Sequence, residues 1–481
     1  MNNESLKSTA IKGIIWSAVD KFAVQMGQFV VSIVLARILL PEDFGLLGML
    51  AIFIAISQTF IESGMGLGLI QRQDRTDIDF STVFVFNLAI SSLFYLLLFF
   101  SAPFIASYFN QPQLIDLTRV LGLSLFVSSL AIVQRTKLTI AINFKAIAKT
   151  NVIGVIIGGI TGIVAAMYGF GVWSLVIQTL LGSFASTVSL WFFSHWTPSI
   201  AFSRNSFRNL FGFGSKLLLS GLYAQLLTNV YNICIGKYYP ISSLGYYTRA
   251  KGFADISAGT ITSILQQATF PILAAVQNDK EKLVSVYSRM IRMSSFFIIP
   301  IMTLIALLAK PIVILLLTEK WVAVIPLLQW MVFARIFFPM SAINMNLLNA
   351  IGRSDLFLKI DLSKLPLTVI AMIITIPLGV KAMIIGHVVT SGVAFFINAY
   401  LPGKYYGYGA INQLKDMAPV IFATIGMSIV VFFMTYFIDS LLLQLIIGSL
   451  LAVVSYVSFC WLLKLEELAQ VKEAILNLIK R

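Results

Sequence analysis

The chain contains 481 residues, of which 58% are hydrophobic and only 11% are charged. An average soluble domain carries roughly 25% charged residues, so this composition excludes a soluble globular protein and indicates a chain that lies mostly within a lipid bilayer. The net charge of +14 would suggest a nucleic-acid partner in a soluble protein, so the positions of the cations decide what it means here. The two cysteines are far apart in the sequence, which argues against a disulfide framework or a cysteine metal site.

Apolar runs of about 20 residues predict about 14 transmembrane helices, joined by connections too short to hold a soluble domain. The chain begins with a short polar segment, Met1 to Lys12, and the first predicted span after it carries Asp20 and Lys21. No small-residue cleavage site follows this span, so we expect a first transmembrane helix rather than a removed signal peptide. The predicted fold class is an all-α integral membrane protein.

The first predicted helix and the turn after it recur in the second half of the chain. Arg37 and Gly45 reappear about 200 positions later as Lys237 and Gly245. In each copy, the helix before this motif carries polar residues at steps of three and four, which places them on one helix face. Repeated halves with polar inward faces are typical of transporters whose site opens to two sides in turn. The stripes contain Lys21, Gln25, Gln28 and Ser32 in the first copy, and Gln225, Thr228 and Asn232 in the second.

The Lys and Arg residues lie mainly in the loops of one side. If the N-terminus is cytoplasmic and the spans alternate, cations on the cytoplasmic side outnumber those on the opposite side by about three to one. This asymmetry predicts cytoplasmic N- and C-termini and assigns most of the positive charge to anionic membrane lipids, with no nucleic-acid partner. After the last span, residues 464–481 place apolar residues at helical intervals between charges, which predicts an amphipathic helix along the inner membrane surface.

Charged residues inside spans are costly and are normally retained where they face a cavity or a partner. Lys21 lies about 12 Å into the first span, so its ammonium either reaches back to the interface or lines a cavity with the rest of its stripe. Asp20 faces another direction, because adjacent helix residues do not share a face. Glu62, at the end of the second span, is either a coupling acid or an interfacial residue.

A second group of ionisable residues lies in the later spans. Arg335 is near the centre of an apolar span, where we expect either a cavity with an anionic ligand or a buried ion pair. Lys251 and Asp255 are one helical turn apart, a spacing that also suits a simple pair. Arg249 has no acidic residue within one turn of the sequence.

Motifs for catalysis or cofactor binding are absent from the sequence. It contains no GxxxxGK[ST] phosphate-binding loop, which argues against ATP hydrolysis within this chain. His195 and His387 are far apart, and neither a Ser/His/Asp triad nor a pair of carboxylates has usable spacing. We therefore expect a protein that is not an enzyme, with no cofactor and no bound metal ion.

Several short motifs together resemble one family of membrane proteins. Their order and spacing resemble those of the polysaccharide-unit (Wzx-type) flippases of the multidrug/oligosaccharidyl-lipid/polysaccharide exporter superfamily, most closely the capsular and colanic-acid branch. The motifs are Leu35-Ala36-Arg37 with Phe44-Gly45-Leu46-Leu47, Ile70-Gln71-Arg72, Leu244-Gly245-Tyr246-Tyr247 with Arg249-Ala250, Phe270-Pro271-Ile272-Leu273 with Gln277-Asn278-Asp279-Lys280, and Thr318-Glu319-Lys320-Trp321 ahead of Ile325-Pro326.

The resemblance implies two pseudo-symmetric lobes of six helices, over residues 1–195 and 205–402, then two further helices over 416–463 and the amphipathic tail. It also implies a flippase that moves undecaprenyl-pyrophosphate-linked oligosaccharide repeat units across the bacterial inner membrane by alternating access. The transported repeat units would become part of a surface polysaccharide such as O-antigen, capsule or exopolysaccharide. Besides the lipid-linked oligosaccharide, polysaccharide polymerase and export machinery are then candidate partners.

Members of the family rely on cavity cations, which together with the polar stripes gives a set of candidate residues. Two other interpretations stay open. A drug/cation antiporter of the same superfamily would use buried carboxylates and a smaller apolar pocket, and a membrane-embedded polysaccharide polymerase or ligase would need a long external loop, which the sequence lacks. The candidate substrate-binding residues are Lys21, Gln25, Gln28, Arg37, Gln225, Asn232, Arg249, Lys251 and Arg335, and the candidate ion-coupling acids are Asp20, Glu62 and Asp255.

Overall fold

Helices account for nearly all of the described chain, which confirms the predicted all-α class. The structure, a computed structural model, describes residues 3–479 apart from the side chains at positions 3–12, 14, 15, 213, 216, 217, 261, 264–268, 270, 271, 354, 355, 357, 358, 474, 475, 478 and 479. Within residues 3–479 there is no strand. The predicted amphipathic tail contains helix α19, Glu466–Ile479, and its last two residues lie outside the described part.

The chain divides into two compact units, Met1–Gly245 and Tyr246–Arg481. The boundary falls inside helix α9, after its first turn. The predicted lobe boundaries at 195 and 205 stay a prediction. The helices of the first unit are α1 Asn3–Ile38, α2 Pro41–Glu62, α3 Met65–Gln71, α4 Asp77–Phe109, α5 Leu114–Ile140, α6 Phe144–Met167, α7 Trp173–Ser194 and α8 Arg204–Tyr238, followed by the start of α9 Ile241–Ala275.

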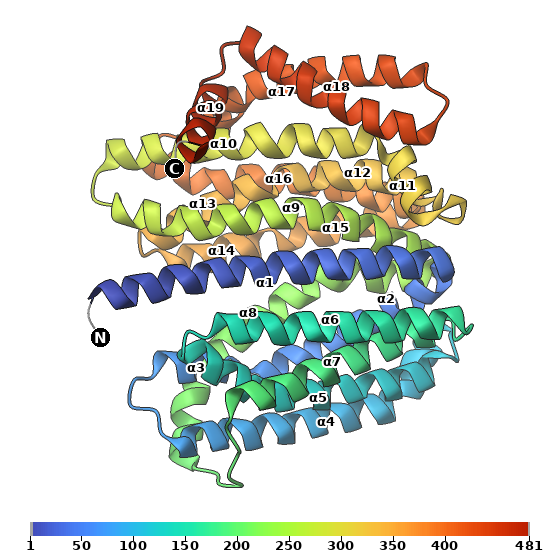
Figure 1. The fold of residues 1–481 in the computed structure, drawn as a ribbon, viewed down its shortest axis with the longest axis vertical. Helices are drawn as coiled ribbons and strands as arrows, with labels where there is room; N and C mark the ends of the chain where they lie inside the picture. The colour runs from blue at the N-terminus through green and yellow to red at the C-terminus, as the bar shows by residue number, and fades with distance from the viewer. Residues whose placement is uncertain (1–2, 480–481) are drawn as a thin grey trace. The chain divides into compact units, whose positions relative to one another are not determined.

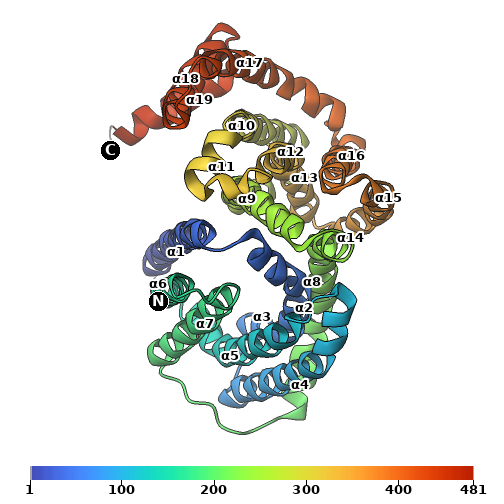
Figure 2. The same ribbon diagram turned by 90° about the vertical axis from the view of Figure 1, so that its right-hand side faces the viewer.

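The second unit contains the rest of α9 and all later helices. Its helices α17 and α18 lie side by side in both views (Figure 1, Figure 2). The elements are α10 Lys280–Leu307, α11 Ala309–Leu317, η1 Glu319–Trp321, α12 Val324–Ile336, α13 Phe338–Ala350, α14 Ser354–Ser363, α15 Leu365–Thr375, η2 Ile376–Leu378, α16 Val380–Tyr406, α17 Ala410–Tyr436, α18 Leu441–Leu462 and α19.

Twelve helical segments in the described part of the chain are long and apolar enough to cross a bilayer. Helices α8 and α9, which are each 35 residues long, are not among these twelve. The predicted total of about 14 spans therefore stays a prediction, whereas a multi-pass helical membrane protein is supported directly.

Three of the twelve segments contain a break in the described backbone. The α2–α3 segment breaks at Ser63 and Gly64, whose φ angles of 44° and 68° are left-handed. The α12–α13 segment breaks at Phe337, and the α14–α15 segment breaks at Lys364. A break leaves backbone N–H and C=O groups without helical partners, which is tolerated at membrane depth only where protein or a water-filled cavity surrounds them. In transporters, such breaks commonly mark the substrate or ion site.

Helix α6 packs closely against α7 and α1 through glycines. A Cβ atom at Gly158 would lie 2.6 Å from the carbonyl oxygen of Gln178, and one at Gly159 would lie 2.5 Å from the side chain of Val31. Without hydrocarbon on these positions, the helix backbones approach each other closely, which is the usual role of small residues between membrane helices. The contact fixes α1, α6 and α7 as neighbouring walls of the first unit.

A buried polar network joins α10, α13 and α17 in the second unit. Tyr287 donates a hydrogen bond to Oδ1 of Asn344. The amide of Gln413 donates to the Tyr287 hydroxyl at 2.9 Å and to Asn344 Oδ1 at 3.1 Å. All three side chains are buried, and their mutual bonds remove the cost of leaving buried polar atoms without partners. The network therefore anchors α17 to the interior of this unit.

Candidate functional site

The first unit contains a cavity of ≈ 1000 Å³ whose walls come from α1, α2, α3, α5, α6, α7 and α8. Its size is at the upper end of the range for small-molecule pockets, about 300–1,000 Å³. Among the described lining residues, Arg135 is the single cation and Glu62 the single acid. The polar part of the wall consists mainly of amides and hydroxyls, including Gln28, Gln58, Gln178, Gln225, Asn151, Thr136, Ser183 and Ser186.

Glu62 reaches this cavity because α2 ends there. The left-handed turn at Ser63 and Gly64 ends α2, and α3 begins directly after it. This side of the cavity is therefore formed by two helical segments and the turn between them. The amide of Gln58, one turn earlier, donates to Glu62 Oε1 at 3.2 Å. The Glu62 side chain is exposed, so its carboxylate remains accessible from the cavity.

A chain of hydrogen bonds joins three walls of the cavity. Asn151 on α6 donates through Nδ2 to both carboxylate oxygens of Asp20 on α1, at 3.1 and 3.0 Å. Its Oδ1 accepts a hydrogen bond from Nη2 of Arg135 on α5 at 3.0 Å. Asp20 thus faces α6, whereas Lys21 is exposed on another face of α1, as helix geometry predicts for adjacent residues.

The first predicted stripe only partly faces the cavity. Gln28 lines it, together with Val24 and Val31 of the same helix. Lys21 and Gln25 are outside the lining, the first exposed and the second half-buried. Arg37 also lies outside it and is exposed in the last turn of α1.

The second predicted stripe forms a ladder of amides on α8. Gln225 lines the cavity. Asn229 donates to the Gln225 carbonyl oxygen at 3.1 Å, and Asn232 donates to Asn229 Oδ1 at 3.4 Å. Asn229 was not among the predicted residues, although its spacing from Gln225 is one helical turn. Thr228, predicted in its place, is exposed and donates to the Ala224 carbonyl oxygen at 2.8 Å.

In the second unit, Arg335 is bound to an acid on another helix. Its Nε lies 2.6 Å from Oδ1 of Asp255, and its Nη1 lies 3.4 Å from Nε2 of His387. The Arg335 side chain is 15% exposed and that of Asp255 is 42% exposed. Lys251 lies close enough to interact electrostatically with Asp255 and Arg335. Arg335 precedes the break at Phe337 by less than one helical turn, so the ion pair lies beside a discontinuous helix.

Arg249 lies near the start of α9, away from this ion pair along the helix. Its guanidinium carbon is 6.0 Å from the centroid of the Trp321 ring, at the edge of the range for a cation–π contact. Trp321 is fully buried. The arrangement gives Arg249 an aromatic neighbour in the η1 turn.

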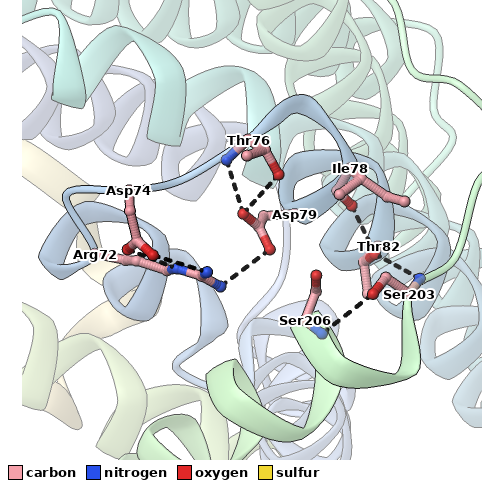
Figure 3. Close-up of polar contacts among 8 residues, drawn as sticks. All are labelled: Arg72, Asp74, Thr76, Ile78, Asp79, Thr82, Ser203 and Ser206. Atoms are coloured by element: carbon pink, nitrogen blue, oxygen red, sulfur yellow. Dashed lines mark hydrogen bonds and ion pairs between the residues drawn. The ribbon is translucent and has the colours of Figure 1, made fainter.

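A polar network connects the end of α3, the start of α4 and the start of α8 (Figure 3). Arg72 contacts Asp74 Oδ1 through Nε at 2.9 Å and Asp79 Oδ1 through Nη1 at 3.2 Å. The hydrogen bond from Arg72 holds the pKa of Asp74 below its ordinary value, and the same bond raises the pKa of Arg72. The second oxygen of Asp79 accepts the backbone N–H of Thr76 at 2.7 Å and caps the start of α4.

The start of α8 is tied to the same network. The backbone N–H of Ser203 donates to Thr82 Oγ1 at 3.0 Å, and the Ser206 side chain points toward Asp79 (Figure 3). Ser203 also caps α8, because its hydroxyl accepts the Ser206 N–H. These contacts are structural and hold α8, with its cavity-lining amides, against α4.

Residues 34–326 match the family described as polysaccharide biosynthesis protein. The chain belongs to this family. The teichuronic acid biosynthesis protein TuaB of Bacillus subtilis is 23% identical over 355 residues, which cover 73% of each chain. The lipopolysaccharide biosynthesis protein WzxC of Escherichia coli is 24% identical over 376 residues, covering 77% of this chain and 76% of the relative. The family assignment made from the sequence motifs is therefore confirmed.

The fold of this polysaccharide biosynthesis protein is also found among solved structures. The lipid II flippase MurJ, in an inward closed conformation, superposes with a TM-score of 0.79 over 93% of this chain and 98% of its own length, at 17% sequence identity. At that identity the likeness establishes the fold alone.

Proposed function

We propose that this polysaccharide biosynthesis protein is a flippase that moves undecaprenyl-pyrophosphate-linked oligosaccharide repeat units across the bacterial inner membrane by alternating access. Membership of the family supports a role in making a surface polysaccharide such as O-antigen, capsule or exopolysaccharide. The fold shared with a lipid II flippase supports transport of a lipid-linked saccharide. The observation that carries the proposal is the large cavity of the first unit, whose polar lining consists mainly of amides and hydroxyls and includes one cation among the described residues.

The chemistry of that cavity fits the headgroup of such a lipid. Sugar hydroxyls donate and accept hydrogen bonds, and side chains such as Gln28, Gln178 and Gln225 offer both functions. A guanidinium suits a pyrophosphate, and the polyprenyl chain can stay in lipid throughout transport. A drug/cation antiporter would instead need buried acids, whereas Glu62 is the single acid among the described residues of the wall and its side chain is exposed.

Several predicted residues are part of this proposal. Gln28 and Gln225 would contact the glycan in the first unit, with Lys21, Gln25, Arg37 and Asn232 acting at other stages of transport. Arg249, Lys251 and Arg335 would supply cationic contacts in the second unit. Energy would come from the membrane potential, worth about 2.3 kcal/mol per charge per 100 mV, or from an ion bound at Asp20, Glu62 or Asp255.

The proposed function also implies an orientation in the membrane and a later step for the transported glycan. Its N- and C-termini would be cytoplasmic, in keeping with the cation asymmetry of the loops. Polysaccharide polymerase and export machinery would act on the glycan after it reaches the outer leaflet.

A deletion strain tests the function in cells. Loss of the protein should remove the surface polysaccharide and leave lipid-linked repeat units in the inner leaflet, where an external glycosidase cannot reach them in spheroplasts. The wild-type gene should restore both. Normal surface polysaccharide in the deletion strain, with altered resistance to cationic drugs, would favour the antiporter instead.

A further inference from the structure

Arg135 lines the cavity, although it is not among the candidate substrate-binding residues identified from the sequence. It lies near the end of α5, so its charge counts as one of the cytoplasmic cations that set topology. The structure instead makes it the single cation among the described residues of the cavity wall, with an exposed side chain. Ser128, Ile132, Arg135 and Thr139 share one face of α5, and all four line the cavity.

The guanidinium of Arg135 is oriented by a hydrogen bond to the side-chain amide of Asn151. Nδ2 of Asn151 faces the carboxylate of Asp20 as a donor, so Oδ1, the acceptor end of the amide, faces the guanidinium. Asp20 therefore determines which way the Asn151 amide points. A direct carboxylate partner would have neutralised the arginine, whereas a neutral amide holds it and leaves its charge.

Most of the hydrogen-bonding capacity of Arg135 remains available. The guanidinium has five N–H donors, and among the described residues its one hydrogen bond is the bond to Asn151. No described carboxylate lies within ion-pair distance of it. A cation with unused planar donors that is fixed in the wall of a polar cavity is arranged to receive an anion from the cavity side.

We infer that Arg135 binds the pyrophosphate of the lipid-linked substrate and that Asp20 and Asn151 are its positioning residues. This inference rests on the proposed function. A planar guanidinium can bind two phosphate oxygens at once, which gives geometric selectivity that a point charge lacks. On the predicted topology, α5 ends and α6 begins on the cytoplasmic side, so Arg135 lies at the end of the cavity where a substrate made in the cytoplasm is loaded.

The direct test is isothermal titration of the purified full-length protein with geranylgeranyl pyrophosphate, with geranylgeraniol as the uncharged control. Arg135→Ala should weaken binding of the pyrophosphate by roughly 10- to 100-fold, the range for losing hydrogen bonds to a charged group, and should leave geranylgeraniol binding unchanged. Arg135→Lys should recover part of the affinity. Arg119→Ala is the matched control, because Arg119 is on the same helix but stacks on Phe99 outside the cavity.

A double-mutant cycle separates positioning from a structural role. Asp20→Asn should weaken pyrophosphate binding less than Arg135→Ala does, and it should have no further effect once Arg135 is already alanine. An effect of Asp20→Asn that persists in full in the Arg135→Ala background would overturn the positioning role. Size-exclusion profiles establish that each variant is folded, and Arg135→Lys provides the comparison if the alanine variant is not.

Two negative results have different meanings. If the wild-type protein binds pyrophosphate and Arg135→Ala binds it equally well, the inference about Arg135 is wrong while the flippase function stands. If the wild-type protein binds geranylgeraniol and geranylgeranyl pyrophosphate with equal affinity, the cavity does not recognise the headgroup. That result would overturn this inference, whereas the flippase function, which also rests on glycan contacts, is decided by the deletion strain.

Discussion

Gly45 and Gly245 pack reciprocally against the first residue of each other's helix. A Cβ atom at Gly45 would lie 2.2 Å from the carbonyl oxygen of Ile241, and one at Gly245 would lie 1.9 Å from the carbonyl oxygen of Pro41. Pro41 opens α2 and Ile241 opens α9, so the four residues are two equivalent pairs of the sequence repeat. A self-complementary contact of this kind is the signature of a local two-fold relation.

We predict that Gly45→Ala and Gly245→Ala both destabilise the protein, because a methyl group at either position must displace backbone. Overpacking of this kind costs about 1–3 kcal/mol, which thermal unfolding of the detergent-purified protein would resolve. Gly252→Ala on α9 is the matched control, since nothing lies within 4 Å of a Cβ there. Equal melting temperatures for all three variants would show that the reciprocal contact is not maintained.

Neutralising Arg335 should affect stability and transport separately. Arg335→Met leaves Asp255 without its partner at 2.6 Å, and we expect a loss of about 1–3 kcal/mol, less than for a fully buried pair because Asp255 is partly exposed. Arg335→Met combined with Asp255→Leu should recover part of the melting temperature, because the unpaired carboxylate is removed while Lys251 loses its acidic neighbour. Transport should stay lost in the double variant if Arg335 contacts the substrate. Restored transport would assign the pair a purely structural role.

The two acids that bind Arg72 should differ in importance. Asp79→Asn should cost about 1–3 kcal/mol at pH 7, because the Asp79 side chain is only 2% exposed and caps α4. Asp74→Asn should have the smaller effect, since that side chain is 79% exposed. Thermal unfolding of the two variants in one buffer makes this comparison, and a larger loss for Asp74→Asn would contradict it.

The contribution of Asp74 to the stability of the native state should also depend on pH, and it should decrease on acidification. Arg72 lowers the pKa of Asp74 from its ordinary value of 3.8, so the interaction stabilises the native state above that pH and is lost as pH falls through the lowered native pKa. The stability difference between wild type and Asp74→Asn should therefore be constant from pH 5 to 7 and shrink below about pH 4. A difference that grows on acidification would show that another group dominates.

Reporter fusions test the predicted topology. Green fluorescent protein fused after residue 481 should fluoresce, and alkaline phosphatase fused at the same point should be inactive, because the cation asymmetry predicts a cytoplasmic C-terminus. An active phosphatase would place the C-terminus outside and change the number of spans by one.

The sequence was sufficient to predict the helical membrane class and the family, because apolar runs and ordered motifs are local signals. It was less informative about the cavity. The stripe on α1 has a helical period, but periodicity alone does not say which neighbouring helix each face meets. Gln28 therefore lines the cavity while Lys21 and Gln25 lie outside its lining.

Two residues show why contacts between helices escaped prediction. Arg135 follows a polar face of α5 that a search at helical spacing would have found, but its position near a helix end favoured a topological role. The partner of Arg335 could not be deduced, because Asp255 is 80 residues away in the sequence and has Lys251 one turn before it. Only the packed structure shows that Arg335 binds this acid.

Reconstitution into vesicles is the direct test of the flippase function. The full-length protein would be placed in vesicles with a fluorescent undecaprenyl-pyrophosphate-linked oligosaccharide, and a membrane-impermeant glycosidase would be added outside after a potential or an ion gradient is imposed. We expect that the inner-leaflet substrate becomes cleavable in vesicles that contain the protein and stays protected in empty vesicles. Continued protection under every imposed gradient, in vesicles that do move a small cationic drug, would contradict the flippase function.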